Sequence, residues 1–119
     1  MALNQAALEE LRSLDPDGST GLLARIITTY LDDASALLRQ INSALAAGDC
    51  ASLARHAHSL KSTSMSLGAA QVGALAREIE LAGNNKELAN CKALLDTLTV
   101  ECTAAEQLLR AEIAASKSS

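Results

Sequence analysis

The chain has 119 residues, a size typical of one domain, and Ala and Leu dominate its composition, with Tyr30 as the single aromatic residue. The net charge of −4 excludes a basic nucleic-acid footprint, and the lack of aromatics leaves no surface on which bases would stack. No apolar run of about 18 residues predicts a membrane span, and MALNQAALEE does not resemble a secretory signal.

The residue types also indicate the fold class. Ala and Leu favour helices, whereas strands favour the β-branched and aromatic residues that are scarce here. Pro16 is the only proline, so no helix breaker follows it. The cysteines, Cys50, Cys91 and Cys102, fit neither a disulfide framework nor a zinc site, so we expect reduced thiols and a cytoplasmic setting.

The first two predicted helices differ in length. A short helix spans Asn4 to Leu14, with Asn4 as its N-cap, and the turn-forming cluster from Asp15 to Gly21 predicts the first connection. A long helix follows from about Thr20 to Ala47, and Gly48 is expected to end it. Its apolar residues recur three and four positions apart, as a core stripe does: Leu23, Ile27, Tyr30, Ala34, Leu37, Ile41 and Leu45.

Two shorter helices come next. The third runs from Cys50 to Leu67, with Asp49 as its N-cap and Gly68 at its end. The fourth runs from about Ala69 to Ala82, and Gly83 is expected to end it. The core positions of this fourth helix are Val72, Leu75, Ile79 and Ala82.

The last predicted helix is long. Asn84 and Asn85 supply the turn and the cap, the helix spans Lys86 to Ala115, and the polar residues 116–119 form a tail that we expect to fray. Its core side holds Leu88, Cys91, Leu95, Leu98, Cys102, Ala105 and Leu109. Because short connections favour antiparallel neighbours, residues 1–119 predict one all-α domain, an antiparallel up-down four-helix bundle with a short additional N-terminal helix.

The third helix carries the residues of chemical interest. A helical wheel places Leu53, Ala57, Leu60, Ser64 and Leu67 on its core side. His56 lies at the border of that side, where a packing role is expected, and His58 points to solvent between Arg55 and Lys61. The same outward sector holds Ala54, Ser62 and Met65. The two cations disfavour a metal ion and an imidazolium, and they favour a neutral ring that accepts a phosphoryl group. A merely solvated surface histidine is the plainer alternative.

The stretch AHSLKSTSMSLGA, residues 57–69, resembles the signature of histidine-containing phosphotransfer (HPt) domains. That signature has a His, a Lys three residues later, a small residue next, and a Gly ten residues after the His; here these are His58, Lys61, Ser62 and Gly68. The segment ALAREIELAG, residues 74–83, is similar to the family's next helix, including its final Gly83. Two positions depart from the family: Ser62 stands where Gly is frequent, and Glu80 stands where some members place an uncharged polar residue, which leaves the role of Glu80 open.

The resemblance implies a carrier in a two-component phosphorelay, which accepts a phosphoryl group from the Asp of a response-regulator receiver and passes it to the Asp of another. It implies that His58 is the phosphoacceptor, that Lys61 stabilises the phosphoryl charge and that Ser62 leaves room for access. Docking would involve Ala54, Arg55 and Met65. The receiver is expected to bring the Asp and Mg²⁺, so no metal or cofactor is expected on this chain. No motif resembles an ATP site, so the chain would act without kinase activity of its own.

The partners implied are receiver domains and a parent sensor kinase, for a monomer without nucleic-acid or direct membrane contact. Both a free-standing protein and the C-terminal domain of a hybrid sensor kinase, tethered through it to the inner membrane, fit the sequence; the resemblance favours the second. A non-catalytic adaptor or dimerisation module is the competing class. A stand-alone enzyme finds no supporting motif.

Overall fold

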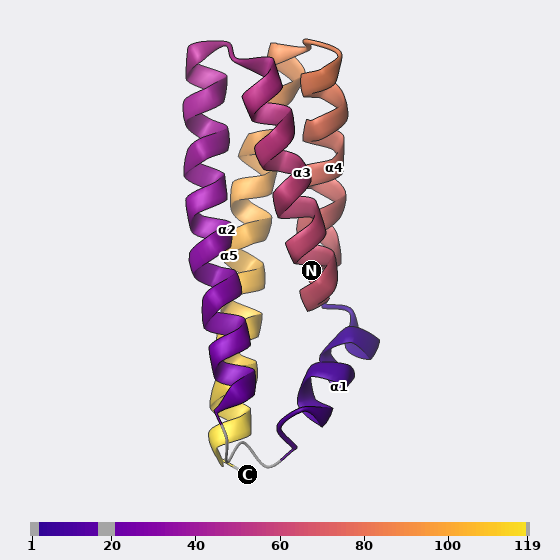
Figure 1. Cartoon of the computed structure of the whole chain (residues 1–119), viewed down its shortest axis with the longest axis vertical. Helices are drawn as coiled ribbons and strands as arrows, with labels where there is room; N and C mark the ends of the chain where they lie inside the picture. Colours follow the sequence, from indigo (N-terminus) through magenta and orange to yellow (C-terminus); the bar gives the residue numbers. More distant parts are fainter. Residues whose placement is uncertain (1–2, 17–20, 119) are drawn as a thin grey trace.

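Helices make up every regular element of the part of the chain that the computed structural model describes, residues 3–16 and 21–118. In chain order they are α1 (Gln5–Ser13), α2 (Leu22–Ala47), α3 (Cys50–Leu67), α4 (Ala70–Asn84) and α5 (Leu88–Ser118). Helices α2 to α5 run alternately up and down, side by side, in Figure 1. The predicted class, an antiparallel four-helix bundle with a short additional N-terminal helix, is confirmed.

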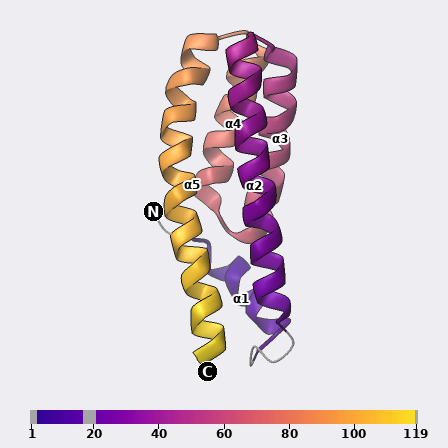
Figure 2. The ribbon, with the colours of Figure 1, turned by 90° about the vertical axis from the view of Figure 1, so that its left-hand side faces the viewer.

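The four bundle helices differ in length, and α1 fills the space that the difference leaves. Helices α2 and α5 extend beyond the lower ends of α3 and α4, and α1 lies beneath those ends (Figures 1 and 2). Leu8 of α1 is buried in the core, and Arg12 donates hydrogen bonds to both carboxylate oxygens of Glu112 on α5. The Asn4 amide donates to the carbonyl of Gly68 at 2.7 Å, which ties the start of α1 to the end of α3.

The ends of α3 follow the prediction. The Asp49 side chain accepts a hydrogen bond from the Ser52 amide at 3.1 Å, an N-cap contact that also lowers the pKa of the Asp49 carboxyl. Gly48 before the helix and Gly68 after it have φ values of 69° and 83°, a left-handed backbone that glycine adopts without steric cost. Gly68 is therefore the turn residue that the sequence predicts.

The end of α4 differs from the prediction. The helix continues through Gly83 to Asn84, with Asn85 as its C-cap, so the prediction of Gly83 as a turn residue is wrong. Lys86, with φ 58°, takes the left-handed position instead, and its amide donates to the Gly83 carbonyl at 3.0 Å. Gly83 lacks a side chain for a different reason, since a Cβ there would lie 2.9 Å from Leu53 Cδ2 on α3.

Two other boundaries shift. Helix α5 begins at Leu88 rather than Lys86, because Lys86 still belongs to the turn that ends α4. It continues to Ser118, past the expected end at Ala115. The predicted Asp15–Gly21 turn and the predicted helix start at Thr20 fall largely on residues 17–20, which lie outside the described residues, and α2 begins at Leu22.

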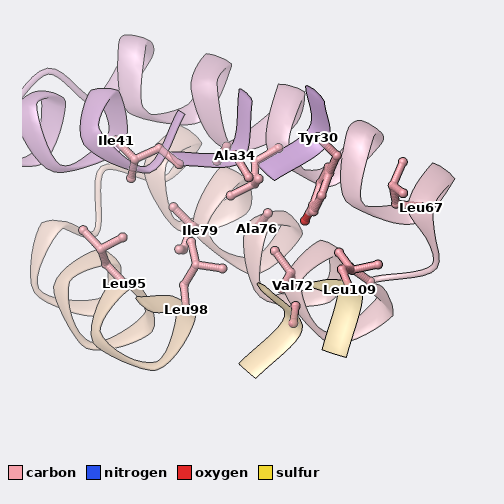
Figure 3. Packing of buried hydrophobic residues seen from close by; sticks show 14 of the residues in the cluster. Tyr30, Ala34, Ile41, Leu67, Val72, Ala76, Ile79, Leu95, Leu98 and Leu109 are labelled. Atoms are coloured by element: carbon pink, nitrogen blue, oxygen red, sulfur yellow. The ribbon is translucent and has the colours of Figure 1, made fainter. Parts of the chain in front are cut away.

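The core forms where the apolar stripes of the four bundle helices, α2 to α5, meet (Figure 3). Most predicted core residues are buried, and four are only partly buried against it: Leu37, Leu45, Leu75 and Cys102. Leu88 is a wrong prediction, because as the first residue of α5 it is 38% exposed. A polar contact crosses the core, where the Tyr30 hydroxyl and Ser64 Oγ lie 2.7 Å apart. None of the described helices has the length and apolar character needed to cross a membrane.

Candidate functional site

His58 lies on the outer side of α3, turned toward α4. The core residues of α3 fix this orientation, because Leu53, Ala57 and Leu60 are fully buried and hold the opposite side of the helix against the bundle. The His58 side chain keeps 56% of its surface exposed. A histidine in this position is held by a rigid helix and is still accessible to another protein.

Glu80 of α4 meets His58 across the gap between the two helices. Its Oε2 lies 2.9 Å from His58 Nδ1, and its Oε1 lies 3.5 Å from Lys61 Nζ. The Glu80 side chain is only 21% exposed, so water screens its charge less than it would on an open surface. One carboxylate therefore contacts both residues that the sequence singles out on α3.

This contact selects a form of the imidazole ring. A carboxylate oxygen accepts hydrogen bonds, so the Nδ1 facing it carries the proton. In the neutral ring the lone pair then sits on Nε2, for which no hydrogen-bond partner is found among the described residues. The nitrogen capable of nucleophilic attack is therefore the one directed away from α4.

The cations beside His58 are arranged less symmetrically than the wheel predicts. Lys61, 29% exposed, is drawn toward Glu80. Arg55 is exposed and donates instead to Ser52 Oγ at 3.2 Å, on its own helix. Ser62, one turn beyond His58, is exposed and small, which leaves the approach to the ring open. The environment of His58 therefore combines one nearby cation, Lys61, with the carboxylate of Glu80. The sequence-based prediction of a ring flanked by two cations is incomplete.

Two of the predicted docking residues differ in their exposure. Met65 is 55% exposed, two turns beyond His58, and its thioether lies beside Gly73 of α4. Ala54 is only 5% exposed, packed at the α3–α4 contact near Gly83, so its expected place on the outer surface is wrong. The error has a simple cause: the wheel for α3 locates the core, but α4 also covers the edge on which Ala54 lies.

His56 takes no part in this arrangement. It is half-buried and lies on the other side of α3, beside a groove that α2 residues such as Arg39 and Gln40 also line. Among the described residues, no group of three or more His, Cys, Asp or Glu side chains is placed to hold a metal ion.

Glu80 is the site residue whose role sequence reasoning left open. The sequence shows that it departs from the resemblance, but its contact with His58 depends on how α3 and α4 are rotated against each other. A charged residue on the α3-facing edge of the next helix is the signal that could have found it.

Comparison with known proteins defines the class to which this bundle and site belong. The family model of the Hpt domain matches residues 25–118, from the first turns of α2 to the end of α5. The chain therefore belongs to the Hpt domain family.

A solved structure supports this assignment. The crystal structure of histidine-containing phosphotransfer protein B (HptB) from Pseudomonas aeruginosa PAO1 is similar to this chain, with a TM-score of 0.85 and 27% sequence identity over 93% of each chain. No curated protein sequence gives a match. The chain is thus a histidine phosphotransfer module of a phosphorelay, in a family that interacts with receiver domains, and the adaptor alternative is not favoured.

Proposed function

We propose that His58 is the phosphoacceptor of this module and that it takes a phosphoryl group from the aspartate of one receiver and passes it to the aspartate of another. The observation that carries this assignment is that the half-exposed ring of His58 is hydrogen-bonded through Nδ1 to Glu80. Nε2 is then the accessible nucleophile. His56 lies on the α2 side of the helix, and no hydrogen bond or ion pair joins it to a carboxylate among the described residues.

Lys61 is the residue that would stabilise the charge of the transferred group. Phosphoryl transfer depends mainly on positioning and on neutralising the phosphoryl oxygens. Lys61 lies one turn from His58 on the same helix, and its ammonium group is held near the ring through Glu80. A modest rotation of its flexible side chain would bring it to a phosphoryl group on Nε2.

The receiver completes the site. We propose that it supplies the aspartate and the Mg²⁺, and that it docks on the exposed side of α3 over Arg55, Ser62 and Met65. A monomeric chain offers this surface without rearrangement. The phosphoryl group then moves between two proteins, with His58 as the carrier.

The test is transfer from a phosphorylated receiver. The wild-type chain should acquire an acid-labile label, because phosphoramidates of histidine hydrolyse in acid. His58→Gln should abolish the label, whereas the matched variant His56→Gln should retain it, with both variants folded by circular dichroism. A label that survives in His58→Gln and is lost in His56→Gln would show that His56 is the phosphoacceptor and would refute the assignment to His58.

A further inference from the structure

Arg77 is an exposed cation on α4, one turn before Glu80, that takes no part in the contacts of His58 and Lys61. No hydrogen bond or ion pair joins its guanidinium to any of the described residues. A guanidinium carries five hydrogen-bond donors and a permanent positive charge. Arg77 therefore offers a complete set of donors to an anion that comes within its reach.

The contacts on either side of Arg77 place it on the edge of α4 that packs on α3. Four residues before it, a Cβ at Gly73 would lie 3.5 Å from the Lys61 carbonyl oxygen. Three residues after it, Glu80 Oε1 lies 3.5 Å from Lys61 Nζ. Positions three and four apart share one side of a helix, so Arg77 lies on the same edge, across from Lys61. Only about 4.5 Å along α4 separates it from Glu80, which contacts His58.

The charges in contact at the site leave a phosphoryl group without sufficient cations. Phosphorylation adds about 1.5 to 2 negative charges to a side chain. The ammonium of Lys61 is paired with the carboxylate of Glu80, so the two charges largely cancel. The Arg55 guanidinium is engaged by a hydroxyl on its own helix. A phosphoryl group on His58 therefore calls for one more cation, and Arg77 is an unpaired one at the edge of the site.

We propose that Arg77 is a second phosphoryl-binding residue, which binds the oxygens of phosphorylated His58 from the α4 side while Lys61 binds them from the α3 side. The proposal rests on the proposed role of His58 as the acceptor. The planar guanidinium fork matches two phosphoryl oxygens at once, which a lysine ammonium does not. The phosphoryl group would then be held between two helices.

The bonds that form and break in the transfer step do not involve Arg77. The lone pair of His58 Nε2 forms the N–P bond, the bond between phosphorus and the receiver's carboxylate oxygen breaks, and its electron pair returns to that carboxylate. No proton moves to or from Arg77, because a guanidinium stays protonated in proteins. Arg77 therefore acts through charge and hydrogen bonding, which attract the anionic group as it arrives and stabilise it on the ring.

The first measurement uses the isolated chain, without a receiver. The wild type and Arg77→Gln are labelled at His58 by phosphoramidate, a small-molecule phosphoryl donor, and the rate of uptake is timed. We expect Arg77→Gln to be slower by about tenfold, because a hydrogen bond between charged groups is lost. Arg77→Lys keeps the charge without the planar fork and should recover part of the rate. Both variants should stay folded by circular dichroism, since Arg77 is exposed.

Phosphorus NMR of the phosphorylated chains gives a second measurement, made by titrating them across neutral pH. A guanidinium in contact with the phosphoryl oxygens favours their dianion and so lowers the pKa of the phosphoryl group. In Arg77→Gln this pKa should rise by about one unit, the shift equivalent to that tenfold change. A residue that only supported the helix, or that only contacted a receiver, would leave the phosphoryl pKa unchanged.

Two further variants separate the explanations. Arg39→Gln removes the same charge from an exposed position on α2, and both its uptake rate and its phosphoryl pKa should equal those of the wild type. Lys61→Ala should slow uptake without unfolding the chain, because it removes the partner cation on α3.

Three results would overturn the proposal and leave His58 as the acceptor. They are equal uptake and equal phosphoryl pKa in the wild type and Arg77→Gln, a loss in Arg77→Gln that appears only with a receiver present, and an equal loss in Arg39→Gln. Labelling of His58→Gln would instead overturn the proposed function.

Discussion

At the scale of single residues, Tyr30 and Ser64 show how a buried polar group in the core is hydrogen-bonded. The Tyr30 hydroxyl is buried between α2 and α3 and meets Ser64 Oγ at 2.7 Å. A buried hydroxyl needs such a partner, since leaving it unpaired costs about 1–3 kcal/mol. The serine at position 64, on the core side of α3, supplies that partner for the Tyr30 hydroxyl.

Burial also sets the ionisation of Tyr30, and this gives a testable pH dependence. Desolvation raises the pKa of the phenol to about 12, with the Ser64 contact acting in the opposite direction. In the unfolded chain the phenol ionises at about pH 10. The contribution of the neutral phenol to stability is thus complete below pH 10 and is lost as the pH rises toward 12.

Because Tyr30 is the only tyrosine and the chain has no tryptophan, absorbance at 295 nm reports its titration without interference. We expect a midpoint near 12, or a step that coincides with alkaline unfolding followed by circular dichroism. A midpoint near 10 in a chain that is still folded would show that the phenol is open to water.

The site residues divide into those that one helix defines and those that two helices define. His58, Lys61 and Ser62 lie within five positions on α3, so their spacing alone places them together. The contact of Glu80 with His58 and the burial of Ala54 both depend on the approach of α4. A wheel drawn for one helix contains no information on that approach. For this reason the sequence left the role of Glu80 open and wrongly placed Ala54 on the outer surface.

At the scale of elements, two glycines of α4 determine how closely it packs on α3. A Cβ at Gly83 would lie 2.9 Å from Leu53 Cδ2 and 3.3 Å from Ala54 Cβ. A Cβ at Gly73 would lie 2.5 Å from Met65 Sδ. Glu80 lies between these positions in the sequence, so the close approach at both glycines brings its carboxylate within reach of α3.

The same substitution at the two glycines should have different effects on stability. Gly83→Ala should lower the free energy of unfolding by about 1 kcal/mol, because Leu53 is fully buried and overpacking exceeds the gain in helix propensity. Gly73→Ala should leave it unchanged or raise it by about 0.5 kcal/mol, because the half-exposed Met65 can turn toward solvent. Urea unfolding followed by circular dichroism measures both; equal losses would contradict this account of the α3–α4 contact.

The helices themselves were largely predictable, since their stripes and caps are local features. Asp49 caps the start of α3 and Gly68 caps its end, as the sequence indicates. The boundary near Gly83 was not predictable in the same way, because a glycine that ends a helix and a glycine that admits a neighbouring helix are identical in sequence. Lys86 in the left-handed position gives no sequence signal, since lysine does not favour that conformation.

At the scale of the whole molecule, the scaffold and the working surface are separate. The Ala- and Leu-rich stripes fill the core, and α1 closes the end that the shorter helices leave open. His58 lies on the outside of α3, and α5, which packs mainly on α2 and α4, lies away from it. A change on the surface around His58 should therefore affect partner binding and leave both the fold and the chemistry of the ring intact.

Met65 allows this separation to be tested, because it is 55% exposed and lies about 10 Å from His58 along α3. Met65→Glu should slow transfer from a phosphorylated receiver by about tenfold, since a charge placed in the interface costs roughly 1.4 kcal/mol or more. Labelling by phosphoramidate, which needs no docking, should stay at the wild-type rate. The matched control is Val100→Glu, which adds the same charge at a 67% exposed apolar position on α5 and should leave both rates unchanged. Equal losses in the two variants would mean that net charge, rather than the His58 face, governs docking, and a loss of phosphoramidate labelling in Met65→Glu would mean that Met65 acts on the ring itself.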